Sequence, residues 1–230
     1  MSRSNNHLVI IGSGPGISHH VAHHFTQRFT RIVLIARSTE TVQKTKQSLL
    51  SSTSDLDITT HALDVASLPQ LRETLSSIPS PECIFFNAAR VRPAGFFDDT
   101  AEEISYDFAI TNLALYEVAK WAVPQLVQLA NSGDTTARPS FIVTNSLLPM
   151  YPIPALFSLS LTKAAQRNLV QSLAMEYAPK GVNVALVSIG GRVDEGFISL
   201  SPKSIAERIW AIHNTERGSF RWDNEVLEGI

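Results

Sequence analysis

The sequence predicts an α/β fold in which one doubly wound, parallel β-sheet is flanked by helices. Apolar, strand-like runs alternate with helical patterns along the 230 residues. Most of these runs lack polar alternation, as do strands that are buried on both faces. No internal repeat or long linker divides the chain, so we expect one domain over residues 1–230.

The expected elements follow in chain order. Strands are predicted at 7–11, 31–36, 57–63, 83–87, 140–145 and 182–188. Helices are predicted at 16–27, 39–51, 68–78, 100–129 and 155–177, while 131–139 and 189–201 have the composition of loops. A last helix at 202–213 opens on a proline and precedes an edge strand near 219–227. A TIM barrel would need more strands than these.

Composition narrows the classes of partner and compartment. Apolar residues make up 44% of the chain and charged residues 17%, which is typical of a globular protein. The formal net charge of −2 gives no electrostatic reason to expect nucleic acid or a membrane surface as a partner. Cys83 is the only cysteine, and the polar lead before residue 8 is too short for a signal peptide. We therefore expect a cytoplasmic protein.

A glycine-rich turn directly follows the first predicted strand. It contains Gly12, Ser13, Gly14, Gly16 and Ile17, and it leads into a helix. Glycines let a phosphate approach the main chain, and the helix N-terminus offers unpaired N–H groups and a partial positive charge. The pattern indicates a dinucleotide-binding turn, with an ordinary strand-to-helix turn as the alternative.

The end of the second strand indicates which dinucleotide is bound. An acidic residue there would bind the ribose hydroxyls of NAD, but the chain has Ala36. Arg37 can contact a 2′-phosphate through two N–H groups, and Ser38 can assist it. NADPH/NADP+ is therefore the expected cofactor, and a solvated arginine is the alternative.

The run 157–165 (FSLSLTKAA) resembles the YxxxK signature of the short-chain dehydrogenase/reductase family, with a Rossmann-type fold. In that family the residue four before the lysine is the tyrosine that transfers the substrate's proton. Here Lys163 is present and the tyrosine is replaced by Leu159, which can neither donate nor accept a proton.

The resemblance covers nearly the whole chain. It implies a catalytic role for Ser146, which lies 13 positions before Leu159, and a water-holding role for Asn112. It implies further cofactor contacts at Asp64 and Val65 (adenine), Asn87, Ala88 and Ala89 (the NNAG-like motif), Lys163 (ribose), and Ile189 and Gly190 (nicotinamide). Ser18 stands where the family's turn has its last glycine, which puts the helix–strand contact in question.

The missing tyrosine determines the expected chemistry. A general acid is worth about two to four powers of ten in rate, so ordinary ketone reduction should suffer. We expect an NADPH-dependent oxidoreductase that acts on CH–OH or CH–NH groups. Its substrate would be a small organic molecule, such as a secondary metabolite, with an activated C=O, C=N (iminium) or C=C group that the enzyme reduces. The alternatives are a non-redox cyclase, isomerase or dehydratase, and a catalytically inactive nucleotide-binding subunit.

Several weaker signals leave alternatives open. Tyr151 is either a substitute proton donor or an aromatic side chain lining the pocket. Arg90 and Arg92 either meet an acidic substrate or are exposed. The i, i+4 histidines of 19–24 are expected to be structural or solvated, so no metal site is predicted.

Two expectations concern the surface. The helix positions Trp121, Leu126, Leu129, Leu169 and Leu173 suit either a homo-oligomer interface, in a dimer or tetramer, or core packing. The loop before the last helix is short, which suggests an open pocket that accepts a bulky ligand.

Overall fold

The computed structural model describes residues 4–229, and the doubly wound α/β prediction is confirmed. All pairings in the seven-stranded sheet are parallel, and the strand order is β3-β2-β1-β4-β5-β6-β7. The strands are β1 (Ser4–Ile11), β2 (Phe29–Ala36), β3 (Asp57–Ala62), β4 (Pro81–Phe86), β5 (Ser140–Ser146), β6 (Asn183–Ile189) and β7 (Asp223–Val226). Every residue of β4 and β6 is buried, including the polar Glu82, Asn183 and Ser188.

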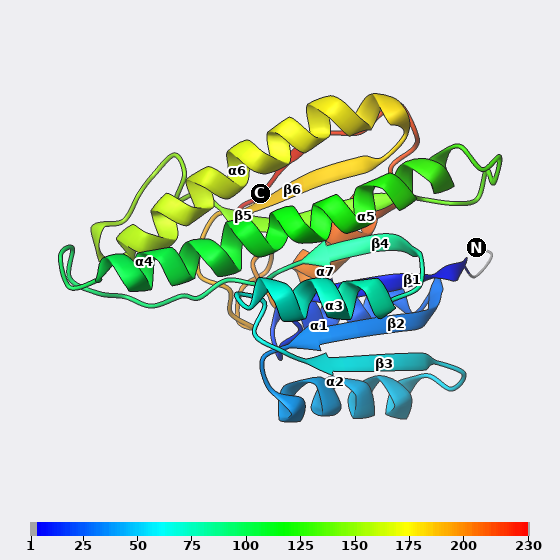
Figure 1. The fold of residues 1–230 in the computed structure, drawn as a ribbon, viewed down its shortest axis with the longest axis horizontal. Coiled ribbons are helices and arrows are strands. Elements are labelled where there is room, and N and C mark those ends of the chain that lie inside the picture. The colour runs from blue at the N-terminus through cyan, green and yellow to red at the C-terminus, as the bar shows by residue number, and fades with distance from the viewer. Residues whose placement is uncertain (1–3, 230) are drawn as a thin grey trace.

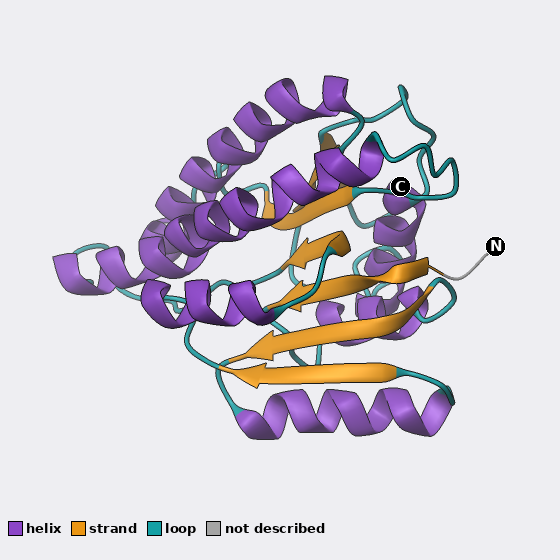
Figure 2. Cartoon of the chain, turned by 45° about the vertical axis from the view of Figure 1, so that its right-hand side comes forward, coloured by secondary structure: helices purple, strands orange, loops and turns teal. Residues whose placement is uncertain are grey.

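Helices cover both faces of the sheet (Figures 1 and 2). They are α1 (Ile17–Phe25), α2 (Thr39–Ser52), α3 (Leu68–Ser77), α4 (Ala101–Phe108), α5 (Ala114–Ala130), α6 (Phe157–Tyr177) and α7 (Pro202–His213). One core lies between the sheet and α3, α5 and α6, and the other lies between the sheet and α1, α2 and α7. Burial of these two apolar layers supplies the main driving force for the fold.

The predicted helix over 100–129 is interrupted in the structure. A π-helical turn, Ala109–Leu113, joins α4 to α5, and within it the backbone N–H of Ala114 bonds the carbonyl of Ala109. Hydrophobic periodicity does not reveal one extra residue in a helical turn. This turn carries Asn112 to a buried position beside α6.

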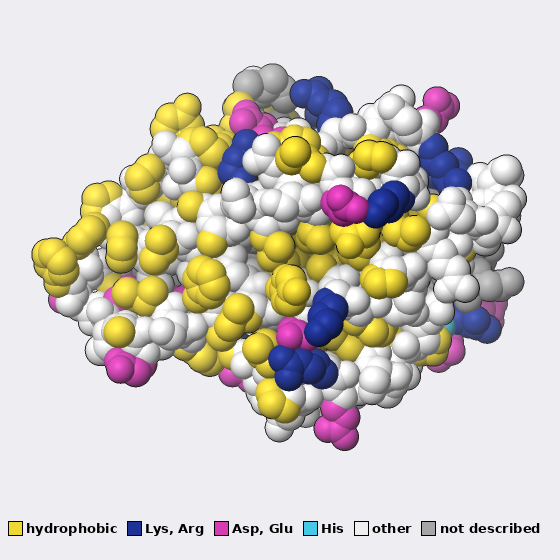
Figure 3. All heavy atoms as spheres, turned by 45° about the horizontal axis from the view of Figure 1, so that its top comes forward, with side chains coloured by type: hydrophobic (Ala, Val, Ile, Leu, Met, Phe, Trp, Pro, Cys, Tyr) yellow, Lys and Arg dark blue, Asp and Glu magenta, His cyan; other side chains and the backbone are white. Residues whose placement is uncertain are grey.

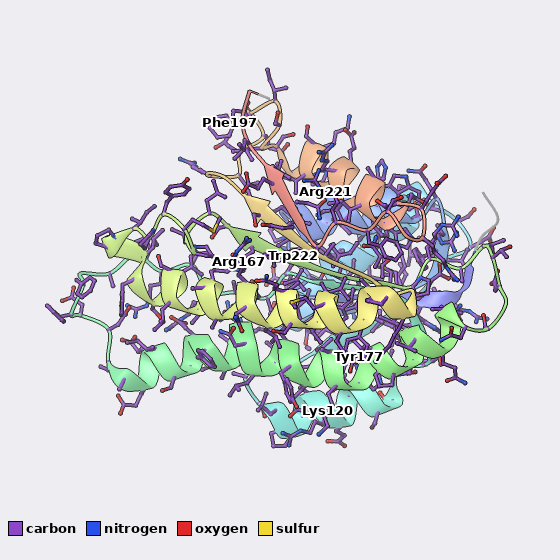
Figure 4. The ribbon with its side chains drawn as sticks, turned by 90° about the horizontal axis from the view of Figure 1, so that it is seen from above. Lys120, Arg167, Tyr177, Phe197, Arg221 and Trp222 are labelled. Carbon is purple, nitrogen blue, oxygen red and sulfur yellow. The ribbon has the colours of Figure 1, made fainter. Side chains whose placement is uncertain are left out.

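The last strand is shorter than predicted, and Arg167 on α6 anchors it. The guanidinium lies over the ring of Trp222, 4.8 Å from its centroid, and donates to Asp223 Oδ2 at 2.7 Å. Figure 4 shows Arg167 and Trp222 approaching each other from these two segments. An aromatic and an ionic contact thus hold the sheet edge against the longest helix.

The strand order of the sheet opens a crevice in which a ligand can bind. After β3, the chain crosses back to pair β4 with β1, with Ile11 opposite Phe86, while β2 lies on the other side of β1. The loops leaving β1 and β4 therefore diverge at the carboxyl end of the sheet. In doubly wound folds such a switch point forms the ligand crevice.

Candidate functional site: a cleft at the switch point

A cleft of about 320 Å³ lies at the switch point, at the carboxyl ends of β1 to β4. It is lined by the 12–18 turn and by Ala36, Arg37, Leu63, Asp64, Val65, Asn87, Ala88, Ala89, Arg90 and Ile110. The structure thus brings together the predicted glycine turn, Arg37, Asp64, Val65 and the Asn87–Ala89 motif. Of the described residues, Ser38, Asn112, Ser146, Tyr151, Lys163, Ile189 and Gly190 are not among those that line it.

The glycine turn is tightly constrained at Gly12. This residue has a φ of +84°, and a Cβ there would lie 2.6 Å from the backbone nitrogen of Ala88. A Cβ on Gly14 or Gly16 would meet no atom within 4 Å and would project into open space. Only a glycine fits at Gly12, whereas Gly14 and Gly16 keep the main chain accessible from the cleft.

Ser18 stands at the position of the family's last glycine, and its hydroxyl makes two hydrogen bonds. Its hydroxyl donates to the carbonyl of Gly12 at 2.7 Å and accepts from Asn87 Nδ2 at 2.9 Å. Asn87 Oδ1 in turn accepts from Thr144 Oγ1 at 2.6 Å. The chain of bonds ties the turn to β4 and β5, so the substitution keeps the helix and strand together. Sequence reasoning missed Thr144, since a threonine in a buried strand carries no distinguishing signal.

Unpartnered donors remain at the turn. Ser13 is buried, and its Oγ has no hydrogen-bond partner among residues 4–229. No side chain caps the N-terminus of α1. Buried polar groups are normally paired, so a hydroxyl left unpaired beside an uncapped helix N-terminus suits an anionic ligand.

Arg37 and Ser38 differ in their surroundings. Arg37 is exposed and lines the cleft at the end of β2. The Ser38 hydroxyl instead caps α2, where it accepts the backbone N–H of Thr41 at 3.1 Å. Ser38 thus has a structural role at the start of α2, and its assistance to Arg37 stays a prediction.

Asp64 and Arg90 are both held by α4. Asp64 accepts a hydrogen bond of 2.5 Å from the Tyr106 hydroxyl, and this bond is the main cause of a raised Tyr106 pKa. Arg90 Nε donates to the buried Asp107 at 2.5 Å, and its guanidinium lies over the Tyr106 ring. Arg90 is ion-paired and lines the cleft, so it is not simply exposed, and its contact with an acidic substrate stays a prediction. Arg92 is ion-paired as well, with Asp99 and Glu103.

The second group of predicted residues surrounds Lys163, outside the cleft lining. The Lys163 side chain is buried, and burial lowers its pKa to about 7. Its amino group donates to the Thr144 carbonyl and to Gln166 Oε1, both at 2.9 Å. Asn112 Nδ2 donates to the carbonyl of Thr162 at 3.2 Å, and its Oδ1 is buried without a partner. Sequence reasoning missed Gln166, although a glutamine three residues after Lys163 on a buried helix face was a usable signal.

The remaining predicted residues lie on the loops that follow β5 and β6. Ser146 ends β5, and its hydroxyl accepts the backbone N–H of Leu148 at 3.3 Å. Tyr151 is 71% exposed in the loop after β5. Ile189 is the last residue of β6 and not a loop residue, and a Cβ on Gly190 would lie 2.3 Å from the side chain of Leu227. Gly190 therefore closes onto the C-terminal segment.

Two loops form an apolar surface beyond these residues. The backbone N–H of Ala94 donates to the carbonyl of Ala155 at 3.0 Å, and the Phe96 and Phe157 rings lie 4.7 Å apart. The apolar rim, as we name it, consists of the exposed side chains Val91, Phe96, Phe97, Met150, Tyr151 and Ile153. Hydrophobic side chains along this end of the molecule are visible in Figure 3.

The loop before α7 is short, as predicted, and a single carboxylate holds it. The backbone N–H groups of Ile198, Ser199 and Leu200 donate to Glu228 at 2.8 to 3.1 Å. These bonds lower the pKa of Glu228 although its desolvation opposes them. Phe197 points outward from this loop in Figure 4.

Comparison with known proteins establishes the family. Residues 6–195 match the family model of the short chain dehydrogenases, and the chain belongs to this family. A Drosophila melanogaster dehydrogenase/reductase SDR family protein 7-like is 26% identical, with 88% of this chain and 68% of the relative covered. A very-long-chain 3-oxoacyl-CoA reductase of Yarrowia lipolytica is also 26% identical, over 78% of this chain and 48% of the yeast protein. The chain thus spans about half the length of this relative.

Solved structures share the fold. A metagenomic short-chain oxidoreductase in complex with NADP has a TM-score of 0.83 at 20% identity, with 97% of each chain covered. An NADPH-bound short-chain oxidoreductase from Pseudomonas aeruginosa, described as having an atypical catalytic centre, has a TM-score of 0.84 at 20% identity. It covers all of this chain, and 98% of its own length is matched.

Two further observations concern membrane-spanning helices and metal ligands. Within residues 4–229, no helix is long and apolar enough to cross a membrane. In the same range no three histidine, cysteine or acidic side chains are arranged to hold a metal ion. His23 instead hydrogen-bonds Ser48 and Ser52 on α2.

Proposed function

We propose that the protein is an NADPH-dependent oxidoreductase that reduces an activated C=O, C=N or C=C group of a small organic molecule. The cleft at the switch point carries this proposal, because it joins a glycine turn with unpaired donors to a basic residue at the end of β2. Family membership supports the reaction class. The substrate and the reduced group go beyond what that membership establishes.

The residues of the cleft fit the proposed cofactor. Gly12, Gly14 and Gly16 admit a pyrophosphate against the main chain, and the unpaired Ser13 hydroxyl and the N-terminus of α1 supply donors. Bound NADPH would supply a hydride to the substrate. The choice of NADPH over NADH rests on Arg37, since Ala36 offers no acceptor for ribose hydroxyls.

The side chains around the reacting group have proposed roles from the family resemblance. Ser146 would orient the substrate, Asn112 would hold a water molecule, and Lys163 would bind the cofactor ribose. Leu159 is buried and offers no proton. A substrate that becomes neutral on accepting hydride, such as an iminium ion, or one that solvent protonates later, avoids this deficiency. Tyr151, exposed in the apolar rim, would contact the substrate, and it remains a candidate donor.

The surface supports the finer points of the proposal. The apolar rim favours a substrate with an apolar body, as many secondary metabolites have. Leu126 is fully buried and serves core packing, whereas Trp121, Leu169 and Leu173 are partly buried against the core and fit either role. The exposed Leu113, Tyr116, Leu161 and Met175 on the same helical layer suit a homo-oligomer, which we propose together with a cytoplasmic location.

Transfer of a labelled hydride tests the reaction class. The protein is incubated with NADPH carrying deuterium at the transferred position and with panels of cyclic imines, enones and ketones, and products are analysed by mass spectrometry. We expect deuterium in the product from imines or enones, and slower transfer to unactivated ketones. NADPH binding without any label transfer across the panels would contradict an oxidoreductase.

A non-redox function is the second candidate, and one observation favours it. The amino group of Lys163 is bonded to Thr144 and Gln166 and does not line the cleft. A cyclase, isomerase or dehydratase would use the pocket to hold a reactive conformer. A product that carries no deuterium from NADPH would support this alternative. Binding of NADPH without any product would support an inactive nucleotide-binding subunit.

A further inference from the structure

The amino group of Lys163 has an unusual position for a residue assigned to a cofactor. The Lys163 side chain is 6% exposed, and its two acceptors are the Thr144 carbonyl on β5 and Gln166 Oε1 on its own helix. Both distances are 2.9 Å, which is typical of full hydrogen bonds. The amino group therefore faces the protein interior.

Gln166 is fixed by contacts to three elements. It is fully buried, and its Oε1 accepts from Lys163 Nζ and, at 3.2 Å, from Asn145 Nδ2 on β5. Its Nε2 donates to the Thr111 carbonyl in the π-helical turn at 3.2 Å. Asn145 Nδ2 also donates to the Lys163 carbonyl at 3.1 Å. Each polar atom of the Gln166 amide thus has a partner, which determines which end of the amide faces Lys163.

Burying the Gln166 amide and the Lys163 amino group together has an energetic cost. A buried amide or ammonium group is unfavourable unless hydrogen-bonded, and an apolar side chain of similar size would pack at position 166 without that cost. Leu159, one turn earlier on α6, offers Lys163 no polar group. Gln166 is then the only side-chain acceptor that the described hydrogen bonds give to the amino group.

We propose that Gln166 is a positioning residue that holds the amino group of Lys163 against β5 and away from the dinucleotide cleft. The proposal deepens the proposed function, because it rests on Lys163 serving the cofactor once the amino group reaches the cleft. Leu159 and Gln166 then act as a pair: one removes the family's proton donor, and the other retains the lysine that would assist it.

Chemical labelling of lysines tests this hold without requiring catalysis. The protein is treated with a water-soluble acetylating reagent, and the labelling rate of each lysine is measured by mass spectrometry. Lys44, with a side chain that is 73% exposed, serves as the internal standard. We expect Lys163 in the wild-type protein to react about 100-fold or more slowly than Lys44, because its amino group is buried and hydrogen-bonded.

Three variants distinguish the hold from simple burial. Gln166→Met keeps the size but removes the acceptor, and it should raise the labelling rate of Lys163 about tenfold or more. Gln166→Glu keeps an acceptor and adds a charge, so labelling should be no faster than in the wild-type protein. Gln171→Met, an exposed position on the same helix, is the matched control and should leave the rate unchanged. An unchanged rate in Gln166→Met would overturn the proposal.

Folding and cofactor binding are followed separately. Cooperative thermal unfolding verifies each variant, and Gln166→Leu replaces the methionine variant if that one does not fold. If neither apolar variant folds, Gln166→Glu decides: faster labelling than in the wild-type protein would overturn the hold, and labelling at the same rate or slower supports it. Saturating NADPH should protect Lys163 in Gln166→Met. Release without protection would support the hold and contradict the role of Lys163 in cofactor binding.

Discussion

The glycine turn and the Lys163 cluster differ in how their polar groups are used. At the turn, Ser13 Oγ is buried without a partner, and the N-terminus of α1 has no side-chain cap. Around Lys163, the protein itself satisfies the Lys163 amine and the Gln166 amide, although the acceptor Asn112 Oδ1 lacks a partner among the described residues. Unpaired donors indicate a place kept for a ligand, whereas paired ones indicate a packed interior. The glycine turn thus stays open to a ligand, whereas the protein itself holds the amino group of Lys163.

The largest effect is expected from the turn itself. Gly12→Ala should weaken NADPH binding about 100-fold or more, because the new Cβ would clash with the Ala88 backbone at a positive φ. Gly133→Ala is the matched control, since Gly133 also has a positive φ but open space around it. Calorimetric titration of both variants measures the difference. Equal affinities would show that the turn does not bind the dinucleotide.

Substitution of Arg37 tests which dinucleotide the cleft selects. Arg37→Ala should weaken NADPH binding about tenfold to 100-fold and leave NADH binding nearly unchanged, because only NADPH carries the 2′-phosphate. Arg31→Ala removes the same charge from an earlier position on β2 and serves as the control. A loss of affinity that is equal for both nucleotides would contradict the role of Arg37.

Leu159→Tyr tests the position at which the family has its proton-donating tyrosine. Restoring the phenol should raise the reduction of unactivated ketones about tenfold, which is below the full value of a general acid because Gln166 still holds Lys163. Leu159→Phe supplies a ring without the hydroxyl and should give no increase. Steady-state rates with a ketone panel measure the effect. No gain with tyrosine would mean that more than the donor has changed.

The last prediction concerns stability, and not binding or rate, on the far face of the sheet. Burial, together with Arg28 and Arg138, lowers the pKa of His213 to about 3, and the ring hydrogen-bonds Ser140. The unfolded state binds this proton near pH 6.5, so the free energy of unfolding should fall as pH drops from about 6.5 toward 3, by at most about 1.4 kcal/mol per pH unit.

Urea unfolding between pH 4 and pH 7 measures this slope. His213→Gln should reduce it, whereas His24→Gln, on the half-buried surface of α1, should retain it. NADPH affinity at pH 7 should change in neither variant, since His213 lies outside the cleft. An unchanged slope in His213→Gln would contradict its buried, neutral state.

The sequence predicted the fold better than it predicted the site. Unbroken apolar runs fixed the strands within a few residues, because burial on both faces leaves a clear pattern. The π-helical turn at 109–113 escaped prediction, since one extra residue does not change the hydrophobic period. Likewise, motif spacing placed Lys163 on the correct helix but could not show where its amino group points. That direction depends on Gln166 and Thr144, which are brought to it only by the tertiary structure.

Substitutions within a motif were equally hard to interpret from the sequence. Ser18 stands in place of the family's last glycine, and its hydroxyl joins Gly12 to Asn87. Arg90, which directly follows the Asn87–Ala89 motif where the family's NNAG has its glycine, makes an ion pair with Asp107. In both cases the partner is distant in the chain, so only the folded structure reveals the compensation.

Calorimetric titration of the wild-type protein with NADPH and with NADH tests the central claim most directly. The preserved cleft predicts binding of NADPH at one site per chain, about tenfold or more tighter than that of NADH. Absence of binding heat for both nucleotides at several temperatures, or tighter binding of NADH, would contradict it.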